Sequence, residues 1–256
     1  MSFLRRKKNP STKKMDEFEQ HILTEQSPFA VQEAYKTLRT NVIFSVPGEG
    51  CKKIVVTSGM QGEAKSTTAV NLGIAFAQNE SKVLLIDCDL RLPTDALKLE
   101  VPQEPGLSNV LVGMNSVDEA IHHLPMGLDL LPAGDVPPNP TELLGSEAMR
   151  KLLDALSERY EYILLDTPPV CTVADASILA KSTSGVLVVV RQNVADREVV
   201  SEALQKLEFA NAKILGFVFT GVENEKQKSY RKKGGYGYGY GYDYSSASQL
   251  TKTGRS

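Results

Sequence analysis

Hydrophobic residues along the chain follow two spacings, one typical of helices and one typical of strands. Val31, Tyr35, Leu38 and Val42 recur at intervals of four, three and four residues, which predicts an amphipathic helix that ends before Pro47. Further along, short runs rich in Val, Ile and Leu alternate with segments of helical spacing. The predicted order is strand 53–57, helix 65–78, strand 82–86, helix 107–111, strand 128–131, helix 146–159, strand 162–165, helix 174–181, strand 185–190, helix 196–209 and strand 213–219.

This alternation predicts an α/β fold with a mostly parallel sheet that helices cover on both faces. After Gly221 the apolar pattern stops, and residues 234–244 read GGYGYGYGYDY, which contains too few aliphatic residues for a core. We therefore expect three parts: a basic and polar leader at 1–28, a folded domain at 29–223 and a disordered tyrosine-rich tail at 224–256.

Composition narrows the class of protein. With 256 residues, 41% hydrophobic and 23% charged, the chain is neither a disordered polymer nor a coiled coil. Its apolar runs are far shorter than the roughly 20 residues of a spanning helix, and no signal-peptide pattern follows the first residues. We expect a cytoplasmic protein. Its three cysteines, Cys51, Cys88 and Cys171, are expected to be reduced thiols because they are far apart, odd in number and without metal-ligand spacing.

The net charge of −2 conceals a segregation of charge. Residues 1–14 carry six Lys or Arg and no acid, and residues 224–256 carry seven against two acids. The middle of the chain is therefore strongly acidic. Basic ends of this kind suit an anionic membrane face, a nucleic acid or the acidic body of a second copy, or they are solvated linkers.

The strongest chemical signal lies between the first predicted strand and the helix after it. The segment Gly59, Met60, Gln61, Gly62, Glu63, Ala64, Lys65, Ser66, Thr67 follows the phosphate-loop pattern G-x-x-x-x-G-K-[ST] with one departure. In this pattern backbone N–H groups surround phosphates, the lysine neutralises them and the hydroxyl coordinates Mg²⁺. Ala64 replaces the second glycine, and we expect its Cβ to cost on the order of 1 kcal/mol at a positive-φ position.

Carboxylates follow two further predicted strands. Asp87 and Asp89 end the run VLLIDCD, and Asp166 ends YILLD. Carboxylates at the carboxyl end of buried strands are suited to holding Mg²⁺ and to accepting the proton of an incoming hydroxyl. The alternative is that one member of the Asp87 and Asp89 pair only caps the next helix.

With these three motifs the chain resembles the bacterial P-loop tyrosine kinases that control capsule and exopolysaccharide synthesis. The motifs are similar to that family's Walker A, Walker A′ and Walker B segments, which implies a P-loop NTPase fold, ATP and Mg²⁺. By this resemblance Lys65 and Ser66 serve phosphate and metal, and Asp87 and Asp89 supply the base and the metal-water contacts. The resemblance further implies that Asp166 completes the metal site with Ser66 and Asp89, and that Arg91 is a supporting catalytic charge.

The tail resembles that family's cluster of autophosphorylated tyrosines. Glycine separates most of these phenols, so each one can enter an active site in turn, and a segment that stacks on RNA bases is the alternative. The resemblance implies transfer between subunits, a membrane-bound activator that recruits the chain to the inner face of the membrane, and a cognate tyrosine phosphatase. No nucleic acid is expected. The implied sites are Tyr236, Tyr238, Tyr240, Tyr242 and Tyr244.

Glu33, Lys36 and Arg39 lie on one side of the first predicted helix, away from its apolar stripe. A solvated charged face is the simplest interpretation. The family carries E-x-x-R-x-x-R on such a helix for a ring-shaped homo-oligomer such as an octamer. Lys36 departs from that motif, and lysine lacks the bidentate geometry of arginine.

Two other functions fit parts of the pattern. An ATPase of the septum-positioning or partition type shares the deviant Walker motifs, but it carries a signature lysine where this chain has Met60. A nucleotide-binding scaffold without phosphotransfer is suggested by Ala64. The two alternatives are distinguished from a kinase by whether the tail becomes phosphorylated.

Overall fold

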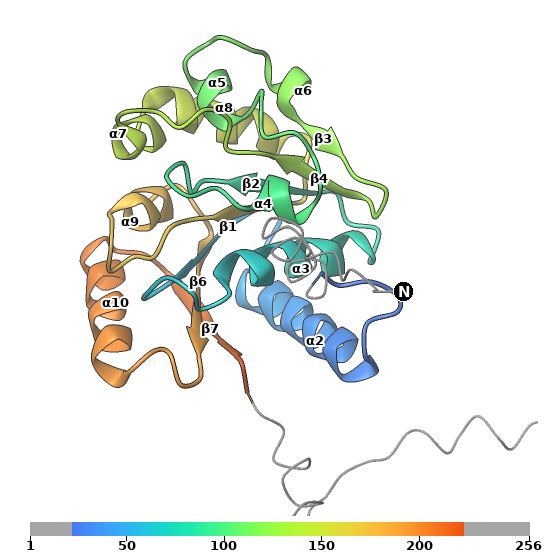
Figure 1. Ribbon diagram of the computed structural model, residues 1–256, viewed down its shortest axis with the longest axis vertical. Coiled ribbons are helices and arrows are strands. Elements are labelled where there is room, and N and C mark those ends of the chain that lie inside the picture. Colours follow the sequence, from blue (N-terminus) through green and yellow to red (C-terminus); the bar gives the residue numbers. More distant parts are fainter. Residues whose placement is uncertain (1–21, 223–256) are drawn as a thin grey trace, which may run out of the picture. The chain divides into compact units, whose positions relative to one another are not determined.

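A seven-stranded sheet forms the centre of the domain, and its strand order is β3-β4-β2-β5-β1-β6-β7 (Figure 1). The computed structural model describes residues 22–222. All neighbouring strands are parallel except β3, which pairs with β4 in the antiparallel direction. The strands are β1 (Lys52–Ser58), β2 (Val83–Asp87), β3 (His122–His123), β4 (Leu128–Leu131), β5 (Tyr162–Asp166), β6 (Gly185–Arg191) and β7 (Ile214–Thr220).

Helices cover both faces of this sheet (Figure 1). The helices α2 and α3 share one apolar cluster with the sheet, and α5, α8, α9 and α10 share the other. The β2 and β5 strands are completely buried or nearly so, as expected for strands covered on two sides. The helices are α2 (Phe29–Ser45), α3 (Lys65–Ala77), α4 (Asp95–Lys98), α5 (Leu107–Leu111), α6 (Val117–Ala120), α7 (Pro140–Leu144), α8 (Glu147–Ser157), α9 (Asp175–Ala180) and α10 (Arg197–Phe209).

The parallel arrangement brings several chemical motifs to one edge of the sheet. The P-loop follows the carboxyl end of β1, and Asp87 on β2 is in register with Asp166 on β5. Because β1 pairs with β5, the loop and both carboxylates meet on neighbouring strands. The fold therefore assembles the predicted site from segments that are far apart in the sequence.

The predicted fold class and the order of the main elements are confirmed. Four short elements were not predicted: α4, α6, α7 and β3. The predicted apolar stripe of α2 is partly wrong, because Val31 is 40% exposed whereas Val42 is buried. Val31 lies in the first turn of α2, before the helix packs along α3. The predicted leader falls mostly outside the described residues, and the predicted tail with its tyrosine cluster does so entirely.

The described part of the chain also bears on membrane insertion. Among residues 22–222, no helix combines the length and the apolar character that crossing a bilayer requires.

Candidate active site

The loop between β1 and α3 has the backbone shape that a phosphate loop requires. Gly62 has φ 87° and Ala64 has φ 69°, so two positions of the loop are left-handed. The expectation for Ala64 is confirmed, and its methyl group makes this conformation costly by about 1–2 kcal/mol. The α3 helix begins at the next residue, Lys65, so its first N–H groups face the hollow of the loop.

Two residues of the loop are tied into the protein behind it. A Cβ atom on Gly59 would lie 2.5 Å from Cγ1 of Val199, so any other residue here would force the Val199 side chain on α10 to shift. Glu63 is buried, and its carboxylate accepts hydrogen bonds from the backbone N–H groups of Met60 (2.6 Å) and Arg191 (3.2 Å). The Glu63 side chain therefore holds the loop in shape, and only its backbone can face a nucleotide.

The ends of β6 and β7 complete this support. The Thr220 hydroxyl donates to the backbone carbonyl of Glu63 at 2.9 Å, and the Arg191 guanidinium donates to the carbonyl of Gly62 at 3.0 Å. The remaining predicted loop residues lie where a ligand can reach them: Met60 and Gln61 are exposed and Thr67 is half-buried. Sequence reasoning left Thr220 without a role, and the structure gives it one in positioning the loop.

Lys65 lies against the predicted carboxylates. Its Nζ is 3.0 Å from Oδ2 of Asp89, 3.6 Å from Oδ2 of Asp166 and 3.2 Å from Oγ of Ser66. Burial lowers the pKa of Lys65, but Asp166 and Asp89 outweigh that effect and the net pKa is raised. The ammonium group therefore stays charged, and it forms ion pairs with Asp89 and Asp166 beside the phosphate loop.

Asp87 is completely buried, and three backbone groups bind its carboxylate. Oδ1 accepts the N–H of Asp89, and Oδ2 accepts those of Thr94 and Asp95, each at 3.1 Å. Burial and the Asp166 carboxylate raise the pKa of Asp87 to about 7. Asp87 therefore also binds the N–H groups at the start of α4, which begins at Asp95, as the capping alternative predicts.

The donor set fits Mg²⁺, because hydroxyl and carboxylate oxygens are the hard ligands this ion prefers. Both oxygens of the buried Asp166 lack a hydrogen-bond partner, as expected for an oxygen that faces a cation. Ser66, Asp89 and Asp166 were predicted as the metal set. A second group, Asp87, Asp95 and Asp166, has carboxylate oxygens that all lie within 4.8 Å of one another.

Comparisons with known proteins match this arrangement. A family model described as an AAA domain matches residues 51–214. The tyrosine-protein kinase YwqD of Bacillus subtilis is 38% identical over 199 residues, which cover 77% of this chain and 84% of YwqD. This chain belongs to the tyrosine-protein kinase family. Solved structures agree: the kinase domain of Escherichia coli tyrosine kinase ETK has 33% identity and a TM-score of 0.73, covering 82% of this chain and 80% of that one. The chimerical protein CapA2B2 has 36% identity and a TM-score of 0.73, covering 76% of this chain and 86% of that one.

In this kinase Arg91 contacts residues of α7 and α9. Its Nη2 donates to the Thr141 hydroxyl at 2.8 Å, and its Nε lies 3.6 Å from Oδ2 of the buried Asp175. The Thr141 hydroxyl donates in turn to Asp175 at 2.6 Å. Arg91 therefore joins the loop after β2 to α7 and α9, and its role as a supporting charge stays a prediction.

The charged residues of α2 in this kinase do not form one freely exposed face. Lys36 and Glu33 form an ion pair of 2.8 Å at the surface. Arg39 is half-buried, and its Nη1 donates to the carbonyl of Ala75 near the end of α3 at 2.7 Å. The prediction of an exposed trio is corrected for Arg39, because α2 packs along α3 and its guanidinium binds a carbonyl of the last helical turn there.

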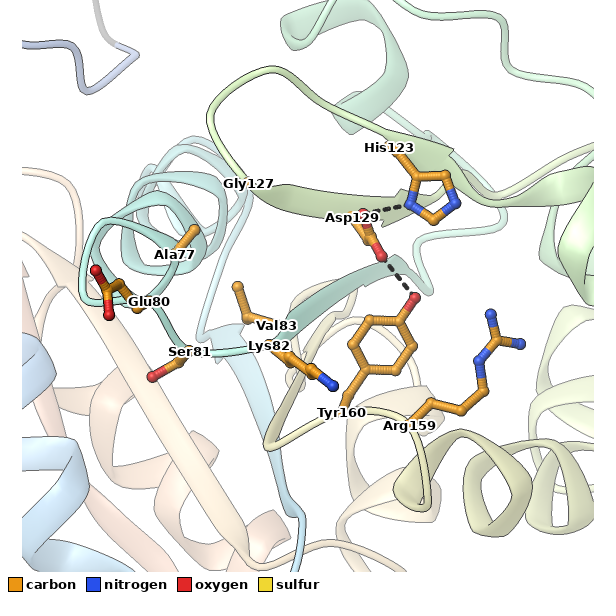
Figure 2. A pocket seen from close by; sticks show the side chains of 10 residues that line it. All are labelled: Ala77, Glu80, Ser81, Lys82, Val83, His123, Gly127, Asp129, Arg159 and Tyr160. Carbon is orange, nitrogen blue, oxygen red and sulfur yellow. Dashed lines mark hydrogen bonds and ion pairs between the residues drawn. The ribbon is translucent and has the colours of Figure 1, made fainter.

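A separate cavity of about 480 Å³ lies at the amino ends of β2 and β4, and it contains none of the predicted site residues. Figure 2 shows Asp129 between two partners in this cavity, with His123 on one side and Tyr160 on the other. The Tyr160 hydroxyl and Nδ1 of His123 each lie 2.7 Å from the Asp129 carboxylate. The candidate kinase site lies at the carboxyl ends of the strands, so this cavity at their amino ends is separate from it.

Proposed function

We propose that this kinase transfers the γ-phosphoryl group of ATP to tyrosines of its own C-terminal cluster, between subunits, and to other proteins. The observation that carries the proposal is the charged Lys65 ammonium stored between Asp89 and Asp166 at the start of α3. A strand, a left-handed loop and a helix N-terminus then provide the cradle for phosphates. Relatives named tyrosine-protein kinases support the tyrosine as acceptor.

Each side chain of the site has a role in this proposal. Lys65 leaves the carboxylates and neutralises the phosphates together with the N–H groups of the loop. Ser66, Asp89 and Asp166 would hold Mg²⁺, which supplies positive charge next to the phosphoryl oxygens when it is bound. The phenol oxygen forms a bond to the γ-phosphorus, the bond from that phosphorus to the leaving ADP breaks, and the phenol proton goes to a carboxylate.

Asp87 is the proposed acceptor of that proton. A base acts best when its pKa lies near the working pH, and the pKa of about 7 supports this role. The carboxylate is 0% exposed and binds three backbone N–H groups. The loop after β2 must therefore move before a phenol can reach it. Asp89 lies closer to Lys65 and to the mouth of the site, and it is the second candidate for the base.

The wider role follows the family resemblance. We place this kinase in the control of capsule or exopolysaccharide synthesis, with a membrane-bound activator, a tyrosine phosphatase and a ring-shaped assembly of copies. The basic residues that precede the tyrosine cluster are suited to guide it toward the acidic body of a second copy. Phosphate on the tyrosines would reverse that attraction and release the contact.

The test is intact mass and peptide mapping of the full chain after incubation with Mg-ATP, alone and with the cytoplasmic segment of a membrane partner. Lys65→Met removes the phosphate-binding ammonium, and Lys151→Met at an exposed position of α8 is the matched control. We expect phosphate on Tyr236 to Tyr244 in the unmodified chain and in the control, and none in Lys65→Met.

Transfer between subunits has its own experiment. A chain with Lys65→Met keeps all tail tyrosines, and a second chain keeps Lys65 but carries Phe at the five tyrosine positions. Phosphate on the first chain after mixing supports transfer between copies. An unmodified tail in every mixture despite bound ATP would refute the kinase proposal and favour a scaffold or a positioning ATPase.

A further inference from the structure

The short helix α4 brings a carboxylate to the active site that no motif announces. Asp95 is the first residue of α4, eight positions after Asp87, and its side chain is 0% exposed. Its backbone N–H binds Asp87, which fixes the start of α4 beside the end of β2. Carboxylate oxygens of Asp87, Asp95 and Asp166 all lie within 4.8 Å of one another.

Hydrogen bonding divides these three carboxylates into two kinds. Asp87 is occupied by backbone donors on both oxygens. Within residues 22–222, neither oxygen of Asp95 has a hydrogen-bond partner, and Asp166 is contacted by the Lys65 ammonium at 3.6 Å. A buried carboxylate without partners is costly, and native proteins retain such a group where a ligand completes it. Among the described residues, both oxygens of Asp95 are therefore without a donor, and Asp166 has the Lys65 ammonium beside Oδ2.

The charges of this region do not balance. Four carboxylates and two lysines share the buried space: Asp87, Asp89, Asp95, Asp166, Lys65 and Lys98. With all of them ionised, the net charge is −2. Lys98 is engaged with the Thr94 hydroxyl, and Lys65 is needed at the phosphates during the reaction. One divalent cation carries the charge that is missing.

The spacing also suits such an ion. Mg²⁺ binds oxygen at about 2.1 Å and Ca²⁺ at about 2.3–2.6 Å, so two ligands of one ion are separated by at most roughly 4–5 Å. The three carboxylates satisfy this limit without any change of the backbone. Asp87 and Asp166 end the paired strands β2 and β5, and the Asp95 N–H binds Asp87, so all three are held by the edge of the sheet.

We propose that Asp87, Asp95 and Asp166 form a divalent-cation site that fills in the absence of nucleotide. The site differs from the set of Ser66, Asp89 and Asp166 that accompanies ATP, because Asp95 is a ligand and no phosphate is needed. A cation here neutralises the negative charge of Asp166 in place of Lys65. The Lys65 ammonium can then turn toward incoming phosphates. The inference concerns binding by the nucleotide-free chain and does not depend on kinase activity.

The experiment titrates Mn²⁺ into nucleotide-free full chain and measures free Mn²⁺ by electron paramagnetic resonance. Three proteins are compared: the unmodified chain, Asp95→Asn and Asp154→Asn, whose carboxylate is 70% exposed and pairs with Lys53 at the amino end of β1. We expect one Mn²⁺ per chain for the first and the third. We expect affinity weakened on the order of tenfold or more for Asp95→Asn, because a direct ligand is lost.

Thermal unfolding of the same proteins gives a second measurement. Mg²⁺ should raise the melting temperature of the unmodified chain and of Asp154→Asn, and have little effect on that of Asp95→Asn. A cooperative melting transition of Asp95→Asn also shows that this variant is folded. The proposal is overturned if the unmodified chain binds no Mn²⁺ without nucleotide, or if Asp95→Asn binds it as tightly as the unmodified chain. It is also overturned if only Asp89→Asn abolishes binding, because the ion then sits at the ATP-associated set.

Discussion

Replacing Ala64 by glycine should stabilise this kinase, although inside a helix glycine is less favourable than alanine. Ala64 has φ 69° and ψ 26° and directly precedes α3, so it is both a left-handed residue and the N-cap. An L-residue in this conformation costs about 1–2 kcal/mol, and glycine removes that cost. Glycine adds about 0.4–1 kcal/mol of chain entropy to the unfolded state. The difference predicts a gain of about 0.5–1 kcal/mol in the free energy of unfolding.

The assay is urea unfolding followed by circular dichroism, with chelator present so that cations do not contribute. The matched control is Ala34→Gly, an exposed position inside α2. There alanine is right-handed and helical, so glycine should reduce stability by about 1 kcal/mol. The two substitutions are chemically identical and should shift the urea midpoint in opposite directions.

A lower midpoint for Ala64→Gly, close to that of Ala34→Gly, would refute the reasoning about backbone strain. The same variant tests the nucleotide site. If strain in the loop limits the approach of phosphates, Ala64→Gly should also bind ATP more tightly. Unchanged ATP affinity together with increased stability would show that the strain at Ala64 lowers the stability of the fold but does not weaken phosphate binding.

Three further predictions concern residues with particular partners. Glu63→Gln places an amide N–H₂ against one of two backbone donors. We therefore expect about 2 kcal/mol lower stability by urea unfolding and weaker ATP binding by calorimetry. Stability equal to that of the unmodified chain would contradict the role of Glu63 in holding the loop. The pKa of Asp87 is raised in the folded state, so its folded form holds a proton that the unfolded form has lost above about pH 4. Stability measured with chelator should therefore fall as the pH rises toward and through about 7, and Asp87→Asn should flatten that profile. Arg39→Ala removes the bond to the end of α3, and we expect about 1 kcal/mol lower stability and faster amide exchange in α2, with Lys36→Ala as the exposed control that changes little.

The sequence allowed a correct prediction of the sheet because each central strand is a continuous apolar run, which only a doubly covered sheet explains. The phosphate loop was equally accessible, since its chemistry lies in consecutive residues. Even the strain at Ala64 was expected, because the motif itself specifies where a glycine belongs.

Other features depend on contacts between distant segments, and no local pattern announces them. Four residues are too few to show a helical period, so α4 and its Asp95 were missed. Arg39 falls on the polar side of its helix, and only the packing of α2 along α3 reveals the carbonyl of Ala75 as its partner. Arg91 follows the Walker A′ carboxylates directly, but its direction is set by Thr141 and Asp175, which lie 50 and more residues later.

The bond from Thr220 to the carbonyl of Glu63 joins the phosphate loop to the last residue of β7. In the sequence, the tyrosine-rich segment begins shortly after that strand. This bond makes the carboxyl end of β7 part of the support of the phosphate loop. If a nucleotide changes the free energy of this bond, then by reciprocity a force applied at Thr220 changes nucleotide affinity by the same amount.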